Sequence, residues 1–252
     1  MVHNPYIRLV SGADTAVMFI HGIAGTPNHF RDLIPLVELV PEAWSVYNVL
    51  LPGHGGSVKD FARSSRRLWK SYVREVFEEL ANNHERVILV GHSMGTLFSI
   101  QLALEFPDKI PLLFLLAVPM RPYVALPAVS NSLRLALGKL RPDKPMEAAI
   151  GTACGCTPTW RLWKYLGWIP RFIDLFLEIH HTEKVMGALK VPAIVFQSRR
   201  DELVMGSSVR VLMQKGIENV RILPNSGHFY YHSEDRASVR DTFSDQIKRR
   251  LE

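Results

Sequence analysis

A serine between two glycines, in the stretch Gly91-His92-Ser93-Met94-Gly95, separates two apolar segments of the chain. The four apolar residues Val87–Val90 precede it, and an apolar run with helical spacing follows it. This pattern is typical of a tight turn from a strand into a helix, where glycines leave room and the serine hydroxyl is lifted clear of the sheet. The positive end of the helix favours negative charge that develops beside it. The pattern predicts that Ser93 is a nucleophile.

A nucleophilic serine needs a base, because its hydroxyl is hardly ionised at neutral pH, and the base needs an orienting acid. Asp201 follows the apolar run Val191–Phe196, and His228 follows the run Val220–Leu223. The carboxyl ends of parallel strands meet at one edge of a sheet, where the sites of such folds are built. We therefore predict a catalytic triad of Ser93, Asp201 and His228.

Other acids and histidines were weighed for the same roles. Glu202 is the alternative acid, but it lies one residue further from the expected strand than Asp201. His92, inside the turn itself, is expected to have a packing role. Three further histidines do not directly follow an expected strand and are assigned to surface or helix-packing positions: His180, His181 and His232. Two aspartates come after the histidine, which is the wrong chain order for this arrangement: Asp235 and Asp241.

A loop that contains two glycines runs from His21 to Pro27, directly after the apolar run Ala16–Ile20. Acyl-transfer chemistry needs hydrogen-bond donors for the negative oxygen of the tetrahedral intermediate, and backbone N–H groups can supply them. We predict that the N–H groups of Ile23 and Met94 form this oxyanion hole. Because the donors belong to the backbone, the identity of their side chains matters little.

Short apolar runs alternate with segments of helical spacing along most of the chain. Leu68–Leu80 and Thr96–Glu105 have the spacing of helices. Such alternation predicts an α/β fold with a mostly parallel central sheet and helices on both faces. There is room for at most one strand before Ala16. The expected strands are Ala16–Ile20, Ser45–Val49, Val87–Val90, Leu112–Val118, Val191–Phe196 and Val220–Leu223.

The stretch between about Pro119 and Lys190 has no strand pattern and is rich in prolines and aromatic residues. A connection of about seventy residues is too long for a simple crossover between neighbouring strands. We therefore predict that residues 1–119 and 191–252 form the core and that residues 120–190 form an inserted helical cap.

The composition of the 252 residues, 47% hydrophobic and 21% charged, is that of an ordinary globular protein with one large core. Its net charge of +6 comes from 30 Lys and Arg against 24 Asp and Glu. The basic residues are scattered in short clusters, which argues against nucleic-acid binding. The positive charge is compatible with weak attraction to anionic lipid surfaces or to acidic solutes.

The two cysteines, Cys154 and Cys156, are too close in sequence for an easy disulfide and too few for a metal-ligand set, so no metal site is expected. Residues 1–10 lack a basic segment followed by an apolar one, and no apolar run of about 20 residues is present. These features predict a cytoplasmic protein.

The sequence resembles the α/β-hydrolase superfamily, and within it the bacterial carboxylesterases and monoacylglycerol lipases. The segments that carry the resemblance are FIHGIAGTP, LPGHGGS, VGHSMG, AVPM, QSRRDELV and NSGHF. The resemblance implies an α/β-hydrolase fold with a helical cap and a cofactor-free serine hydrolase. It implies the same triad, Ser93, Asp201 and His228, and the same oxyanion hole, Ile23 and Met94. Haloalkane dehalogenases and epoxide hydrolases carry an aspartate where this chain has its serine.

The expected activity is hydrolysis of carboxylic esters through an acyl-enzyme, by a carboxylesterase or a monoacylglycerol or lysophospholipid lipase. Burial of each methylene of an acyl chain contributes about 0.8 kcal/mol, so the apolar and aromatic residues 120–190 favour a lipophilic acyl group. The partner is then a small-molecule ester, with transient membrane-surface contact through the cap. The same triad would also serve a carbon–carbon hydrolase, a thioesterase or a perhydrolase. A non-catalytic ligand-binding protein of the same fold is a further alternative.

Overall fold

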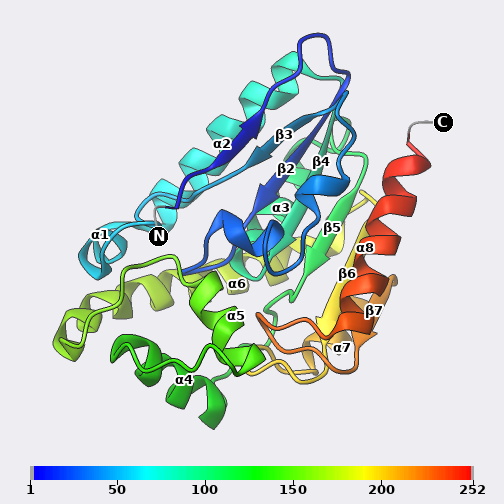
Figure 1. The fold of residues 1–252 in the computed structure, drawn as a ribbon. Coiled ribbons are helices and arrows are strands. Elements are labelled where there is room, and N and C mark those ends of the chain that lie inside the picture. Colours follow the sequence, from blue (N-terminus) through cyan, green and yellow to red (C-terminus); the bar gives the residue numbers. More distant parts are fainter. Residues whose placement is uncertain (1–2, 251–252) are drawn as a thin grey trace.

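The computed structural model describes residues 3–250, which form a seven-stranded sheet covered by helices on both faces (Figure 1). The strands lie in the order β1-β3-β2-β4-β5-β6-β7. β1 is antiparallel to β3, and every other pair of neighbours is parallel, so the predicted mostly parallel sheet is confirmed. The strands are β1 (Tyr6–Arg8), β2 (Thr15–Ile20), β3 (Ser45–Asn48), β4 (Arg86–His92), β5 (Leu113–Leu116), β6 (Ala193–Ser198) and β7 (Val220–Leu223).

Helices connect most of these strands. The α-helices are α1 (Val58–Arg63), α2 (Arg66–Asn83), α3 (Met94–Glu105), α4 (Leu126–Ala136), α5 (Pro145–Ala153), α6 (Ile169–Val185), α7 (Ser208–Gln214) and α8 (Ser233–Lys248). The 3₁₀ helices are η1 (Pro27–Phe30), η2 (Val37–Leu39), η3 (Leu162–Trp168) and η4 (Met186–Ala188). Across residues 3–250 no helix combines the length and the apolar character needed to cross a bilayer. The cytoplasmic location stays a prediction.

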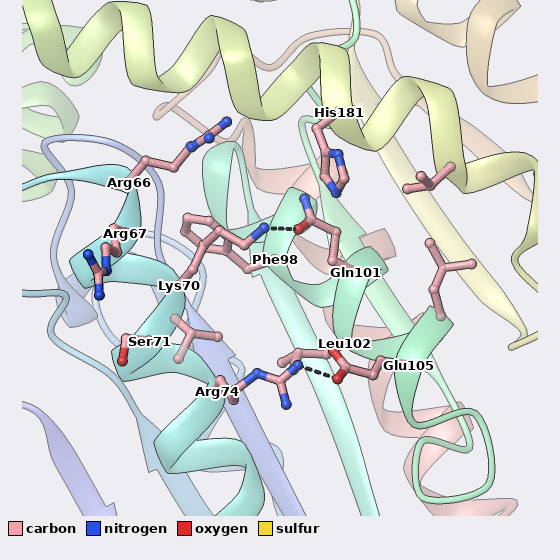
Figure 2. Close-up of a pocket in the computed structure, with 13 residues that line it drawn as sticks. Arg66, Arg67, Lys70, Ser71, Arg74, Phe98, Gln101, Leu102, Glu105 and His181 are labelled. Carbon is pink, nitrogen blue, oxygen red and sulfur yellow. Dashed lines mark hydrogen bonds and ion pairs between the residues drawn. The ribbon is translucent and has the colours of Figure 1, made fainter.

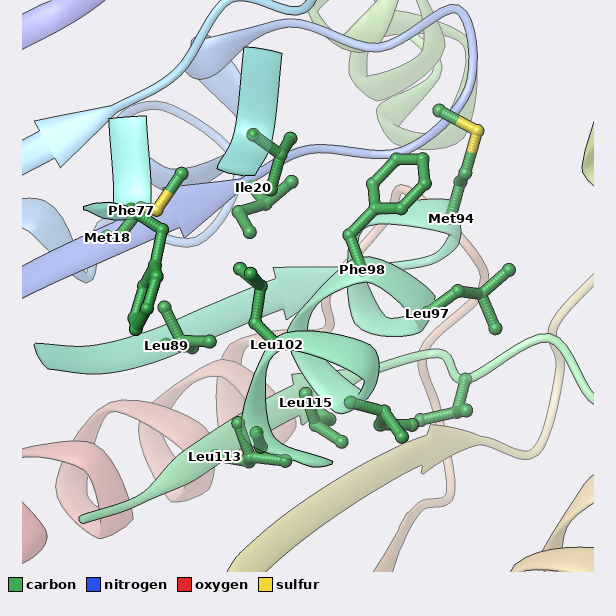
Figure 3. Packing of buried hydrophobic residues seen from close by; sticks show 14 of the residues in the cluster. Met18, Ile20, Phe77, Leu89, Met94, Leu97, Phe98, Leu102, Leu113 and Leu115 are labelled. Atoms are coloured by element: carbon green, nitrogen blue, oxygen red, sulfur yellow. The ribbon is translucent and has the colours of Figure 1, made fainter. Parts of the chain in front are cut away.

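The core has two layers because alternate residues of a strand point to opposite faces of the sheet. Met18 and Ile20 of β2 pack on one face against α2 and α3, which contribute Phe77 and Phe98 (Figure 3). Intervening strand residues pack on the other face, against α8, η1 and η2. Helices therefore protect both faces of the parallel strands, as their continuous apolar runs require.

The ends of several elements differ from the sequence-based expectation. β4 continues two residues beyond Val90, because Gly91 pairs with Ile20 of β2 and His92 pairs with Leu116 of β5. β5 is shorter than expected, since Ala117 turns away with a φ of 54°. Other ends move for the same kind of reason: β6 is Ala193–Ser198 instead of Val191–Phe196, and α3 begins at Met94 instead of Thr96. Strand pairing and turn geometry determine where these elements end, and neither can be predicted from an apolar run of residues.

The segment between β5 and β6 consists of helices and loops, with no strand among its described residues. Its last long helix, α6, packs against α2 and α3, and the three enclose a groove of about 720 Å³ (Figure 2). Two basic residues of this groove have acidic partners: Lys70 lies 3.2 Å from the buried Glu178, and Arg74 is bonded to Glu105. Ser93 does not line the groove. The division of the chain at residues 120 and 190 stays a prediction.

Gly95 lies in the first turn of α3, where this helix crosses the end of β2. A Cβ atom at Gly95 would lie 2.0 Å from the carbonyl oxygen of Ile20, so Gly95→Ala would force helix and strand apart. We expect Gly95→Ala to lower the free energy of unfolding by about 3 kcal/mol, measured by urea denaturation. Gly206→Ala is the control, because nothing lies within 4 Å of its Cβ position, and its effect should stay within about 0.5 kcal/mol. Equal stability of the two variants would contradict this close approach.

Candidate active site

Ser93 occupies a constrained turn between β4 and α3. Its φ of 50° and ψ of −120° are unusual for a residue with a side chain and are maintained by the bonds around it. The Ser93 N–H donates to the carbonyl of Leu116 at 2.9 Å, and the Thr96 N–H and hydroxyl donate to the Ser93 carbonyl at 3.0 and 2.6 Å. A Cβ atom at Gly91 would lie 2.8 Å from the nitrogen of Thr96, which explains the glycine before the serine.

The loop after β2 lies directly against this turn, because β2 and β4 are neighbours in the sheet. A Cβ atom at Gly22 would lie 2.8 Å from the Cβ of Ser93. In the described part of the chain the N–H groups of Ile23 and Met94 have no hydrogen-bond acceptor, so both are free to donate. The strand order reverses here, since β3 lies on one side of β2 and β4 on the other, and ligands of such sheets bind at this point.

Asp201 and His228, which follow β6 and β7, form a buried hydrogen-bonded pair. The Nδ1 atom of His228 lies 2.9 Å from Oδ2 and 3.1 Å from Oδ1 of Asp201. Oδ1 also accepts hydrogen bonds from the N–H groups of Leu203 and Val204, both at 2.8 Å. These bonds orient the carboxylate and assign the imidazole proton to Nδ1, so that Nε2 keeps the lone pair a base needs.

The charges around His228 favour its protonated form. Burial acts most strongly and lowers the pKa of His228, but the charge and hydrogen bond of Asp201, together with the charge of Glu202, outweigh it, so the pKa is raised above 6.5. The Ser93 hydroxyl forms no hydrogen bond to His228 or to any other residue in the range 3–250. Such bonds are often long in ligand-free enzymes and tighten when substrate binds. The structure thus places Asp201 in hydrogen-bonding contact with His228, but among residues 3–250 it has no hydrogen bond between His228 and the Ser93 hydroxyl.

The alternative acid and the histidine of the turn both form hydrogen bonds with the backbone of His228, and the ring of His92 also packs against the His228 ring, with centroids 4.8 Å apart. Glu202 Oε2 accepts a hydrogen bond from the His228 N–H at 3.0 Å. His92 Nε2 donates to the His228 carbonyl at 3.1 Å, and its ring stacks on that of His29 with centroids 3.6 Å apart. Asp235, which comes too late in the chain to be the acid, accepts a 2.7 Å bond from the hydroxyl of Ser226 in the same loop.

Other supporting residues were not identified from the sequence. His54 Nε2 accepts a hydrogen bond from the Ala24 N–H at 3.0 Å, and His21 Nε2 accepts one from the Leu51 N–H at 3.1 Å. Gly155 N–H donates to the Ala24 carbonyl at 2.7 Å. These bonds hold the loop that carries Ile23. The short patterns Gly53-His54 and Cys154-Gly155-Cys156 can be seen in the sequence. Their neighbouring residues do not indicate which distant segments they bond.

The two cysteines flank Gly155 and are free thiols. Burial raises the pKa of Cys154, and burial together with the nearby acidic groups raises the pKa of Cys156 to about 12, so neither is a reactive thiolate at neutral pH. Among residues 3–250, no group of three or more His, Cys, Asp or Glu side chains is arranged to hold a metal ion.

Residues 17–242 match the sequence profile described as the Alpha/beta hydrolase family. The match runs from within β2 to α8 and includes the loops that carry the predicted triad. The chain belongs to the alpha/beta hydrolase family. The resemblance and the α/β-hydrolase fold expected from the sequence are thereby confirmed.

Relatives within the alpha/beta hydrolase family include lipolytic proteins. The chain is 26% identical over 207 residues to a thermostable monoacylglycerol lipase of Bacillus sp. (strain H-257), covering 79% of this chain and 75% of that protein. A structure from a study of two metagenome-derived lipolytic enzymes has a TM-score of 0.69 at 20% identity and covers 99% of this chain and 96% of its own. The monoacylglycerol lipase of Paleococcus ferrophilus has a TM-score of 0.67 at 17% identity, with coverages of 97% and 99%. These two structural likenesses show the fold.

Four buried histidines around this candidate site are neutral in the folded protein at neutral pH. Burial is the largest cause, and it lowers the pKa of His29 to about 3 and that of His54 to about 4. Burial and the neighbouring histidines place the pKa of His21 and of His92 well below 6.5. Their lone pairs therefore stay available as hydrogen-bond acceptors at neutral pH.

The free energy of unfolding should fall steeply below pH 6.5. In the unfolded chain each histidine binds a proton near pH 6.5, whereas in the folded protein His54 does so only near pH 4 and His29 near pH 3. Between these values protonation favours the unfolded state, by about 1.4 kcal/mol per histidine per pH unit. The stability that the neutral rings contribute is present above pH 6.5 and is lost as the pH falls. Urea denaturation at about pH 7.5, 6 and 5 measures the slope.

The variant His54→Gln tests one contribution to this slope. Its side-chain carbonyl can still accept the bond from the Ala24 N–H, but it cannot be protonated. We expect lower stability at neutral pH and a slope that is shallower by about 1.4 kcal/mol per pH unit. A slope equal to that of the unchanged protein would show that His54 is not held neutral.

Proposed function

We propose that this protein is a serine esterase that cleaves carboxylic esters with a lipophilic acyl group, as a carboxylesterase or a monoacylglycerol or lysophospholipid lipase. The observation that carries the proposal is the buried pair of Asp201 and His228 at the same sheet edge as the strained turn of Ser93. The lipolytic activity named for its relatives agrees with it. The proposed roles need no cofactor and no metal.

In the proposed reaction, Ser93 Oγ attacks the carbonyl carbon of the ester while His228 Nε2 takes its proton. The N–H groups of Ile23 and Met94 stabilise the resulting oxyanion, and Asp201 stabilises the imidazolium. The C–O bond to the alcohol then breaks, and the imidazolium gives its proton to the leaving oxygen. A water molecule, deprotonated by the same imidazole, then attacks the acyl carbon of the acyl-enzyme. The bond from this carbon to Ser93 Oγ breaks, the imidazolium returns its proton to Oγ, and the acid is released.

Replacement of the nucleophile tests the site itself. We expect Ser93→Ala to lower kcat on p-nitrophenyl acyl esters by at least about 10⁴-fold, and to abolish labelling by a fluorophosphonate. Ser99→Ala is the matched control, because Ser99 is buried in α3, the helix that directly follows Ser93, and its hydroxyl donates to the Gly95 carbonyl. Full activity in Ser93→Ala would refute the assignment. An unlabelled, inactive natural protein would favour the non-catalytic alternative.

The bond that is cleaved can be identified by comparing oxygen esters, thioesters and a vinylogous diketone, with oxygen esters of different chain lengths. The esterase proposal expects the highest kcat/KM for oxygen esters and an increase with acyl length, because each buried methylene contributes about 0.8 kcal/mol. A higher kcat/KM for thioesters would favour a thioesterase instead of an esterase, and a higher kcat/KM for the diketone would favour a carbon–carbon hydrolase. A kcat/KM that does not change with chain length would refute only the proposed preference for a lipophilic acyl group.

We further propose that residues 120–190 contact the surface of an anionic membrane while the enzyme takes up substrate. This segment carries ten Lys and Arg against five Asp and Glu, so it holds most of the excess positive charge of the chain. Large apolar side chains are exposed at helical spacing along two helical stretches. The first stretch is at α4: Leu126, Val129, Leu133 and Leu137. The second is at η3 and α6: Leu162, Leu166, Ile169, Ile173 and Phe176.

Vesicle binding tests this membrane contact. The double variant Leu126→Ser, Trp163→Ser removes two side chains that are 85% and 60% exposed. We expect it to lower co-sedimentation with anionic vesicles about fivefold or more, with little change of kcat on a soluble short-chain ester. Ile7→Ser, in β1, is the control for loss of an exposed apolar side chain. Equal binding by all three proteins would refute the contact.

A further inference from the structure

The backbone of His228 is held on both sides by side chains that the proposed triad does not require. Glu202 Oε2 accepts its N–H at 3.0 Å, and His92 Nε2 donates to its carbonyl at 3.1 Å. A Cβ atom at Gly227 would lie 2.7 Å from Glu202 Oε2, so the chain passes over this carboxylate with no room for a side chain. The position of the imidazole therefore depends on Glu202 as well as on Asp201.

Glu202 is a buried carboxylate without a countercharge. It is 6% exposed, and among residues 3–250 no lysine or arginine forms a salt bridge with it. Its hydrogen bond is to the N–H of His228. A buried charge is costly unless it is paired. The cation that forms beside it is the imidazolium of His228, which appears when that residue takes the proton of the nucleophile.

The backbone of Glu202 is fixed from the opposite side by the chain that leads from β5 to α4. The Ala125 N–H donates to the Glu202 carbonyl at 3.0 Å, and the Tyr123 N–H donates to the Leu203 carbonyl at 3.0 Å. The Tyr123 hydroxyl also donates to the Asp201 carbonyl at 2.6 Å. These bonds fix the backbone of both acids, while the N–H groups of Leu203, Val204 and His228 bond their carboxylates. The negative charges are thus in place before any proton moves, which is the condition for electrostatic stabilisation without reorganisation.

We propose that Glu202 is a positioning residue of the esterase, which holds the backbone of His228 so that its ring meets Asp201 and whose charge stabilises the imidazolium. This inference rests on the proposed function. Asp201 orients the ring through Nδ1, and Glu202 orients the chain that bears the ring. The two adjacent acids therefore have different roles, and both add negative charge near the same proton.

Two substitutions separate position from charge. Glu202→Gln keeps an oxygen that can accept from the His228 N–H but removes the charge, whereas Glu202→Ala removes both. We expect Glu202→Gln to lower kcat about tenfold with little change in KM, and Glu202→Ala to lower it about a hundredfold or more. The charge of Glu202 raises the pKa of His228, so its loss keeps the ring neutral to lower pH. The acid limb of kcat/KM in Glu202→Gln should therefore shift to lower pH.

Glu234→Gln is the matched control, because it removes the same charge from an exposed position in the first turn of α8, near the histidine loop. It should leave kcat and the acid limb unchanged. If Glu202→Gln has the kcat and the acid limb of the unchanged protein, the inference is wrong. If Glu202→Gln loses as much kcat as Glu202→Ala without a shift of the limb, Glu202 has only a structural role and the charge effect is refuted.

An NMR titration of the His228 ring needs no substrate and keeps this inference separate from the proposed function. The inference expects the titration midpoint of His228 to move to lower pH in Glu202→Gln and to stay in place in Glu234→Gln. An unmoved midpoint in Glu202→Gln would overturn the electrostatic role. If the unchanged protein hydrolyses no ester, the proposed function is refuted. A shift of the His228 midpoint in Glu202→Gln would still support the electrostatic interaction between Glu202 and His228.

Discussion

The candidate site depends on one close approach between backbones, at the carboxyl ends of the neighbouring strands β2 and β4. Gly95 leaves space for the Ile20 carbonyl, and Gly22 leaves space for Ser93, so neither position tolerates a larger residue without displacement. Because the strands are in register with Ile20 opposite Gly91, the loop with its free N–H groups and the serine turn must leave the sheet side by side. The strain at Ser93 persists because the surrounding bonds over-determine it.

Around this contact, neutral histidine side chains accept hydrogen bonds from backbone N–H groups and so fix the neighbouring loops. His54 and His21 each accept a backbone N–H, which a charged imidazolium could not do. Burial keeps them neutral, while the carboxylates of Asp201 and Glu202 favour protonation of His228 alone. A histidine side chain therefore holds a loop in place where no acid is near, and it is a candidate base where two acids are near. Environment, and not residue type, separates these roles.

Residues 154–157 illustrate how distant parts of the chain support the candidate site. Gly155 bonds to the loop after β2 through its N–H, and its carbonyl accepts from the Gly55 N–H. A Cβ atom at Gly155 would lie 2.0 Å from the Gly25 carbonyl oxygen. The stretch between β5 and β6 thus supports the loop that carries Ile23 through the backbone bond from Gly155 to Ala24, besides carrying the exposed apolar side chains of α4 and α6.

The sequence by itself determined the fold family and the order of the elements, because apolar periodicity and glycine spacing are local properties of the chain. It also marked Ser93, Asp201 and His228 as candidates, since each directly follows a strand. Only the tertiary structure decided which of two adjacent acids bonds the imidazole and which bonds the backbone, because that choice depends on how β6 and β7 present their loops to each other. Strand ends and the partners of His21, His54 and Gly155 were also decided there, since pairing and burial arise between segments far apart in the chain.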